Sequence, residues 1–351
     1  MSSVSTALVI ATLPSAYSPA GENPPSFLSP VLNAASATAQ KRVVVVLISR
    51  LFNKHPSVIN NIGLFPGVQK LLTYVYVQAS RDDQPLLEID VILRGLDEEL
   101  NITTADEGEL AVDAVYRVSG DTILIPLPTE LLSLPQIFVD PVVDDSRSVG
   151  SSQDSPSPTT SIAGDRSTYT VTALGGTFDH LHSGHKILLS MAAFVTSRRI
   201  IVGVTHSSLL VRKTHASLIE SLDIRIENVR RFLKRFAPHL EVYDIVPIED
   251  VYGPTAWDTE VEALVVSKET LRGADEIAKL RASKSLSQLD TLVIDVISST
   301  SPDLDDSDQE WLRNAKMSST AIREWISRNG NGDREEVSIT GSAETPREAE
   351  R

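Results

Sequence analysis

The chain has 351 residues, a net charge of −15, 41% hydrophobic residues and no cysteine. This length suggests two domains at roughly 100–200 residues each, and the apolar content is sufficient for a folded core. The composition excludes disulfide frameworks, cysteine nucleophiles and thiolate metal sites, and the acidic balance disfavours binding to nucleic acid.

The first part of the chain combines short apolar runs with one helical segment. Residues 43–48 (VVVVLI) are continuously apolar, which is typical of a strand buried on both faces. The same reasoning predicts a helix over 30–40 and further strands at 8–13, 71–77, 89–93, 122–126 and 136–139. We therefore expect residues 1–145 to form the smaller of two domains, an α/β domain to which the sequence assigns no role.

Three polar stretches set the predicted boundaries. Residues 146–167 are rich in Ser, Pro, Gly and Thr and contain almost nothing to bury, so we expect a flexible linker. Residues 298–308 are polar and acidic and are expected to form a surface loop, and residues 329–351 are expected to form a disordered tail. Residues 168–328 are then predicted to fold as a second domain on their own.

After the linker, apolar runs and helical patterns alternate. Strands are predicted at 170–174, 199–204, 240–246, 263–267 and 292–297, and helices at 186–196, 224–236 and 318–327. Strand–helix–strand repetition implies an α/β fold with a doubly wound parallel sheet. Such sheets bind ligands beyond the carboxyl ends of their strands, at the point where the strand order reverses.

The segment 173–186 (ALGGTFDHLHSGHK) lies between the first of these strands and the first helix. Gly175 and Gly176 let the backbone turn tightly and approach a ligand. His182 and His185 are three residues apart at the helix start, which places both rings beside unpaired N–H groups. Two imidazoles next to a helix N-terminus predict a site for phosphate oxygens.

A second motif, 316–323 (KMSSTAIR), opens the last predicted helix. Ser318, Ser319 and Thr320 provide hydroxyl groups and a helix cap, and Arg323 follows within one turn. Alone, this pattern is that of a well-capped helix. On the same sheet as the histidine motif, it predicts a cradle for polyphosphate.

These two motifs resemble those of the nucleotidylyltransferase superfamily, and most closely those of eukaryotic phosphopantetheine adenylyltransferases of the fungal type. The resemblance covers about 169–326 and includes LLVRK ending at Lys213, DVYGPT at 250–255, and LVVSKET at 264–270 followed by Arg272. It implies a Rossmann-like domain. The chain departs from the family at Ala274 and Ala278, where members often have Gly and Asn.

The resemblance implies adenylyl transfer from ATP, with Mg²⁺, to 4′-phosphopantetheine, giving dephospho-coenzyme A and pyrophosphate in coenzyme A biosynthesis. Thr177 and His185 would hold the α-phosphate, and His182 the β/γ side. Lys213 would contact both phosphate groups. The resemblance thus implies a catalytic group of His185, His182, Lys213 and Thr177; an ATP site of Gly176, Thr177, Phe178, His182, His185, Ser318, Ser319, Thr320 and Arg323; and a substrate site of Thr177, Lys213, Ser267, Lys268 and Arg272.

Several points stay open at this stage. Bacterial members of the family place an Arg at the end of the fourth strand, where this chain has Ser267, and either Lys268 or Arg272 could replace it. We expect no metal ligand among the side chains, and we expect Asp179 to stabilise its loop. Trp257 and Trp311 are expected to pack at the periphery rather than on adenine.

Two other functions remain as alternatives. One is a cytidylyltransferase that acts on a phosphorylated alcohol, since such enzymes share the GTFD-x-x-H-x-GH loop. The other is a non-catalytic subunit of a coenzyme A synthesis complex, with other coenzyme A biosynthesis enzymes as partners. Because no apolar run approaches the roughly 18–20 residues that span a bilayer, we expect a cytoplasmic protein without membrane or nucleic-acid partners.

Overall fold

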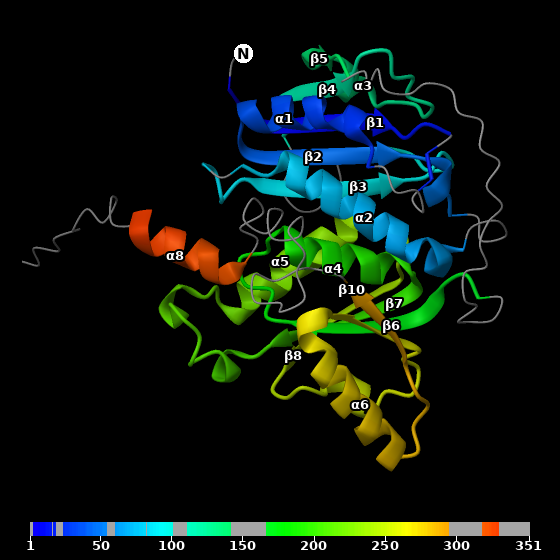
Figure 1. Ribbon diagram of the computed structural model, residues 1–351, viewed down its shortest axis with the longest axis vertical. Helices are drawn as coiled ribbons and strands as arrows, with labels where there is room; N and C mark the ends of the chain where they lie inside the picture. Colours follow the sequence, from blue (N-terminus) through cyan, green and yellow to red (C-terminus); the bar gives the residue numbers. More distant parts are fainter. Residues whose placement is uncertain are drawn as a thin grey trace, which may run out of the picture.

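The computed structural model describes residues 3–15, 17–18, 24–54, 60–81, 83–100, 111–141, 166–294 and 318–329. Within them the strands form two five-stranded parallel sheets, one in each half of the chain (Figure 1). The α/β prediction is therefore confirmed for both halves. The acidic loop at 298–308 lies outside the described residues, as do nearly all of the linker at 146–167 and of the tail at 329–351, so the predicted domain boundaries stay predictions.

The first sheet contains β1 (Val4–Thr12), β2 (Ala39–Ile48), β3 (Glu88–Arg94), β4 (Ala114–Val118) and β5 (Gln136–Val139), in the order β3-β2-β1-β4-β5. Helices α1 (Ser29–Thr38) and α2 (Asn61–Ala79) cover one face. The other face is covered by apolar side chains of loops and of the short helix α3 (Thr129–Leu132). Strands covered on both faces explain continuous apolar runs such as 43–48.

Two predictions for this half are wrong. Residues 71–77 (LLTYVYV) belong to α2 and not to a strand. Helix α2 packs on α1, on β3 and on the second half of the chain, so it is apolar around much of its circumference and shows no clear helical period. Residues 122–126 form a loop whose Ile125 packs on the sheet, and the strand in this region is β4.

The second sheet contains β6 (Tyr169–Gly176), β7 (Thr196–Thr205), β8 (Val242–Ile248), β9 (Ala263–Ser267) and β10 (Asp290–Ile294), in the order β10-β9-β6-β7-β8. Helices α4 (Ser183–Phe194) and α5 (Leu222–Phe236) cover one face and α6 (Leu271–Ser283) the other, and α8 (Ser319–Asn329) follows. The doubly wound sheet is confirmed, whereas α6 is a helix that the sequence analysis missed. None of the helices in the described ranges is long and apolar enough to cross a membrane.

The two halves share one apolar core. Helix α2 packs on α4, and β3 contacts α4 and α5, which lie between the two sheets (Figure 1). Asn61 Nδ2 donates to the carbonyl of Phe194 at the end of α4, at 2.8 Å. Arg94 donates to the carbonyls of Arg235 (2.8 Å) and Phe236 (3.0 Å) at the end of α5. A fragment that begins near residue 167 would expose this shared apolar surface to water.

Candidate active site

The loop between β6 and α4 carries the histidine motif at the carboxyl edge of the second sheet. Strand β6 ends at Gly176, and α4 begins at Ser183. A Cβ atom on Gly176 would lie 3.1 Å from the Phe178 ring, so a side chain there would displace the ring. Phe178 (φ 50°) and His180 (φ 43°) lie in the left-handed region, which non-glycine residues rarely adopt. The loop is therefore tight and places its side chains directly beyond the strand end.

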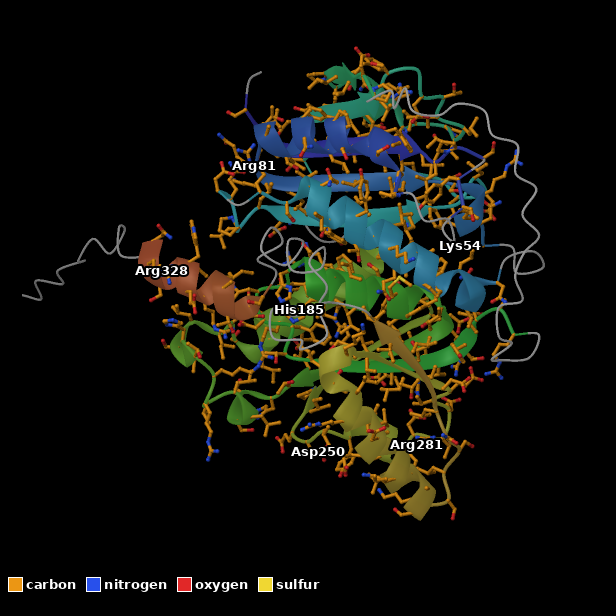
Figure 2. All side chains as sticks on the ribbon, in the orientation of Figure 1. Lys54, Arg81, His185, Asp250, Arg281 and Arg328 are labelled. Carbon is orange, nitrogen blue, oxygen red and sulfur yellow. The ribbon has the colours of Figure 1, made fainter. Side chains whose placement is uncertain are left out.

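His182 and His185 stack on each other where α4 begins. Their ring centroids are 3.9 Å apart, with 26° between the planes. The fully buried Phe178 packs on His185 with 5.3 Å between centroids. The Nδ1 atoms of both histidines are buried and have no hydrogen-bond partner among the described residues. Figure 2 shows His185 near the middle of the molecule, where the two halves meet.

Both imidazoles are neutral at pH 7. Burial lowers the pKa of His182 from 6.5 to about 3, with smaller contributions from Lys186 and His180. The pKa of His185 is lowered well below 6.5 by burial, and then by the neighbouring His182 and Lys213. A neutral imidazole carries one N–H group and one acceptor nitrogen. Each ring can therefore donate one hydrogen bond to a phosphate oxygen without carrying a positive charge beforehand.

Arg323 and Asp179 join the second motif to the first. The two form a buried ion pair, with 2% and 0% of each residue exposed. Arg323 also donates to the Thr214 carbonyl (3.1 Å) and to Thr320 Oγ1 (3.2 Å), and Ser319 Oγ donates to the Asp179 carbonyl (2.8 Å). Asp179 thus holds its loop in place as expected. Arg323, expected on the triphosphate, contacts protein groups in this structure.

Arg225 anchors the same loop by hydrogen bonds to its backbone, a role that the sequence did not predict. Its Nη1 atom donates to the carbonyls of Thr177 (2.7 Å) and Thr205 (2.8 Å), and its Nε atom donates to the backbone carbonyl of Glu220 (3.1 Å). The residue is 0% exposed. A signal was present in the sequence, because Arg225 occupies the helical stripe of α5 that otherwise buries Val229, Phe232, Leu233 and Phe236.

The remaining candidates lie around the same carboxyl edge. Lys213 is exposed in the turns after β7 and is close enough to His185 to lower the pKa of that ring. Ser267 ends β9 and forms a capping box with Thr270. Lys268 and Arg272 follow as exposed residues, and the structure does not decide between them. Trp257 is 66% exposed, whereas Trp311 and Lys316 lie outside the described residues.

One group in the described residues has the composition of a metal site. One potential ligand atom from each of Asp179, His180 and Glu220 lies within 4.8 Å of the others. These side chains are already engaged, however. Asp179 pairs with Arg323, Glu220 Oε2 accepts from the His180 backbone N–H (2.8 Å), and His180 Nε2 contacts the Leu218 carbonyl (2.9 Å). The group fits a structural role better than a metal site.

Comparison with known proteins relates this half of the chain to nucleotide-transferring enzymes. A cytidylyltransferase-like family matches residues 173–325. A phosphopantetheine adenylyltransferase of Saccharomyces cerevisiae is 45% identical over 159 residues, which make up 45% of this chain and 49% of the yeast protein. A phosphopantetheine adenylyltransferase of Methanopyrus kandleri is 42% identical over 121 residues, 34% of this chain and 75% of the archaeal protein.

An uncharacterised protein of Schizosaccharomyces pombe is 38% identical over 158 residues, 45% of this chain and 48% of that protein. In both fungal relatives the match spans about half of their length. In the archaeal relative it spans three quarters, so the similarity there covers most of a complete protein.

Proposed function

Because this chain belongs to the phosphopantetheine adenylyltransferase family, we propose that it transfers the adenylyl group of ATP to 4′-phosphopantetheine. The stacked pair of neutral imidazoles at the start of α4 carries the proposal. The buried Nδ1 atom of His185 has no partner among the described residues, and the hydroxyl-rich start of α8 is anchored to the same loop through Arg323 and Asp179. This arrangement supports binding of a triphosphate chain.

The proposed reaction makes one bond and breaks another at the α-phosphorus. An oxygen of the 4′-phosphate attacks this phosphorus, and the bond to the oxygen that bridges to the β-phosphate breaks and releases pyrophosphate. The nucleophile is already an anion, so no general base is needed. The protein must hold two negative groups in line and stabilise the charge that builds up in the transition state.

Different residues of the site are proposed to bind the nucleotide phosphates and the acceptor phosphate. His185 and Thr177 donate to the oxygens of the α-phosphate, and His182 donates on the β/γ side. Exposed Lys213 places its positive charge between the two phosphate groups, and Ser318, Ser319 and Thr320 hold the triphosphate. Either Lys268 or Arg272 serves the phosphate of the acceptor substrate.

Mg²⁺ is proposed to enter with ATP. It is a hard cation that takes oxygen ligands, and phosphate oxygens provide them. Bound there, it neutralises part of the triphosphate charge. The engaged side chains of Asp179, His180 and Glu220 support delivery by the nucleotide rather than a resident metal site.

We further propose residues 168–328 as the transferase domain, and the cytoplasm as its location. Other coenzyme A biosynthesis enzymes are proposed as further partners of the chain, and residues 1–145 keep no assigned role. Membranes and nucleic acids are not among the proposed partners, since the net charge of −15 repels phosphate backbones.

The direct test is to incubate the full chain with 4′-phosphopantetheine, Mg²⁺ and either ATP or CTP. We expect pyrophosphate release and dephospho-coenzyme A with ATP, and no turnover after chelation of Mg²⁺. Preference for CTP, with a phosphorylated alcohol as acceptor, would favour the cytidylyltransferase alternative. Nucleotide binding without turnover of any acceptor would favour the non-catalytic alternative.

A further inference from the structure

A cavity of about 270 Å³ lies between the two halves of the molecule. Its walls are residues 80–81 and 84–90 from the first half, and the loop 180–183 with parts of α4, α5 and α8 from the second half. The described lining residues include His182 but none of the substrate-side candidates Lys213, Lys268 and Arg272. The cavity therefore adjoins the candidate active site without being part of its substrate side.

The cavity is basic although the chain as a whole is acidic. Asp90 is 2% exposed and pairs with both Lys186 Nζ (2.7 Å) and Arg235, so this buried cluster has one positive charge in excess. Arg231 contacts the neutral side-chain oxygen of Asn228. Of the other lining carboxylates, Glu88 pairs with Arg42, whereas Glu220 accepts from the neutral His180 N–H and keeps its negative charge.

Two polar atoms of the lining residues have no hydrogen-bond partner among the described residues. They are Gln84 Oε1, from the first half, and His182 Nδ1, from the second half, and both atoms are buried. Buried polar atoms in native proteins are nearly always satisfied by protein, water or a ligand. In one tautomer of the ring, His182 Nδ1 can donate to an anion, whereas Gln84 Oε1 is an acceptor and needs a hydroxyl or N–H group of the bound molecule. The two atoms therefore suit a polar molecule that carries both an anionic group and a hydrogen-bond donor.

We propose that this cavity is a second, regulatory site that binds a small phosphorylated anion. The guanidinium group of Arg231 matches the geometry of phosphate oxygens, and Arg235 adds positive charge while it pairs with Asp90. Arg81 also lines the cavity but already donates to both carboxylate oxygens of Asp83, at 2.9 and 2.8 Å. The volume lies just below the roughly 300–1,000 Å³ of sites for drug-sized ligands, so it suits a small metabolite. Its partly apolar lining, which includes Leu181 and Ile322, accommodates the carbon portion of such a molecule.

A ligand in this cavity acts on the catalytic loop through His182, an effect that rests on the proposed function. His182 lines the cavity on one side and stacks on His185 on the other. A hydrogen bond to one nitrogen of an imidazole decides which nitrogen carries the proton. Occupancy of the cavity therefore sets the donor that His182 presents to the β/γ side of the nucleotide, and changes turnover.

The binding test uses inorganic phosphate as the probe and the full chain with its active site filled by a non-hydrolysable ATP analogue. Phosphate binding is measured by calorimetry for the unchanged protein, for Arg231→Ala and for Arg230→Ala. Arg230 is the matched control, since it is the neighbouring arginine of α5, pairs with Glu227 and does not line the cavity. We expect at least tenfold weaker phosphate binding in Arg231→Ala and unchanged binding in Arg230→Ala.

The kinetic test follows turnover at saturating ATP as phosphate is added. We expect phosphate to change kcat in the unchanged protein and in Arg230→Ala, and to have no effect in Arg231→Ala. Phosphate binding that disappears when the analogue is present, or equal affinity in the two variants, would mean an adventitious ion only and would overturn the proposal. Failure of the ATP analogue itself to bind would instead contradict the proposed function. The phosphate affinities of Arg231→Ala and Arg230→Ala would still decide whether the cavity is a phosphate site.

Discussion

The two sheets of this molecule have the same strand order, yet among the described residues only the second sheet carries the candidate active site where its order reverses. Counted within each half, both orders are third, second, first, fourth and fifth strand: β3-β2-β1-β4-β5 and β8-β7-β6-β9-β10. Both therefore reverse beside their first strand, where doubly wound sheets bind ligands. The topology offers two equivalent positions, and the residues after the first strand decide which one is used.

The connections after β1 and β6 differ in length and in chemistry. Strand β6 ends at Gly176 and α4 begins at Ser183, so the helix N-terminus lies beside the strand end. Strand β1 ends at Thr12, and α1 begins only at Ser29. Thr12 N donates to the Asp121 carboxylate (2.8 Å) and Thr12 Oγ1 to the Thr122 carbonyl (3.2 Å).

The equivalent position in the first sheet is thus closed by hydrogen bonds of the chain itself. The difference shows that topology determines where a site can form, and that a short glycine-containing loop with donors determines whether it forms. The first sheet contributes in another way, because its edge strand β3 and helix α2 hold the helices on which the candidate site is built.

The largest effect is expected from Asp90→Asn, which breaks the contact between the halves. Lys186 and Arg235 would remain largely buried without a counter-charge, which costs about 3–5 kcal/mol of unfolding free energy. Urea unfolding at pH 7 measures this loss. The matched control is Asp83→Asn, since Asp83 is 64% exposed in its pair with Arg81. Equal stability of the two variants would show that the halves do not depend on this cluster.

The pH dependence of that effect has a definite sign. Burial alone would raise the pKa of Asp90, but Lys186 and Arg235 outweigh it and lower the pKa below 3.8. The cluster therefore stabilises the fold above the unfolded pKa of 3.8, and this contribution is lost as the pH falls through the lower folded pKa. The difference between Asp90→Asn and the unchanged protein should shrink in strong acid.

His185→Ala tests the chemistry that distinguishes the second sheet. If His185 donates to the α-phosphate as charge develops, kcat should fall by roughly 10²–10³, about 2.7–4 kcal/mol by analogy with the loss of one oxyanion donor. The KM for ATP should change much less, because the triphosphate keeps its other contacts. His206→Ala is the control, since the Nδ1 atom of that ring contacts Ser208. A near-normal kcat with a lowered melting temperature would mean that His185 is a packing residue.

Gly176→Ala and Gly175→Ala test the loop geometry as a matched pair. A Cβ atom at Gly176 meets the Phe178 ring at 3.1 Å, whereas one at Gly175 meets Ile248 at an ordinary 3.6 Å. Because Phe178 packs on His185, we expect kcat to fall about tenfold in Gly176→Ala, about 1.4 kcal/mol. Gly175→Ala should stay within about twofold of the unchanged protein. Similar kcat values for both variants would show that the Phe178 ring moves aside without displacing His185.

Acidification should destabilise the fold through the buried histidines of the second half. Of the seven histidines, only His55 precedes residue 180. The pKa of His182 falls from 6.5 to about 3 on folding, so between these values the unfolded chain binds more protons and stability decreases as the pH falls. The slope is at most about 1.4 kcal/mol per pH unit for this residue. His182→Gln should flatten the stability profile, and an unchanged slope would contradict the prediction.

The smallest effect is expected from Asp121→Asn at the closed position of the first sheet. Weakening its bond to Thr12 should cost about 0.5–1.5 kcal/mol of unfolding free energy. The kcat should not change, because this position contributes no donor to the candidate site. A loss of turnover at full stability would show that the first sheet takes part in the reaction.

Prediction from sequence was most successful where local chemistry decides the outcome. The site residues stay a prediction, but the strand and the helix on either side of the histidine motif were predicted, because a strand, a glycine pair and a helix start are recognisable within a few residues. The prediction was wrong for 71–77, because the helical period of α2 is hidden when a helix is covered on several sides. Helix α6 was missed because only Ala274, Ile277 and Arg281 are buried along it.

The contacts that hold the site together could not be predicted in the same way. Arg225 binds the carbonyls of Thr177 and Thr205, and Asp90 binds Lys186 across the two halves. These pairs are far apart in the sequence and depend on how the elements pack. A charged residue on an otherwise apolar stripe of a helix indicates locally that its side chain will be buried in such a contact, and Arg225 in α5 has this pattern.

The packing of α2 on α4 also has a consequence for synthesis of the chain. Helix α2 is complete at Ala79, whereas α4 ends at Phe194. At about 5–20 residues per second, on the order of ten seconds separate the translation of the two helices. Throughout that interval the apolar face of α2 that will contact α4 is uncovered on the nascent chain. We therefore expect the first half to offer this apolar face to chaperones while the chain is still attached to the ribosome.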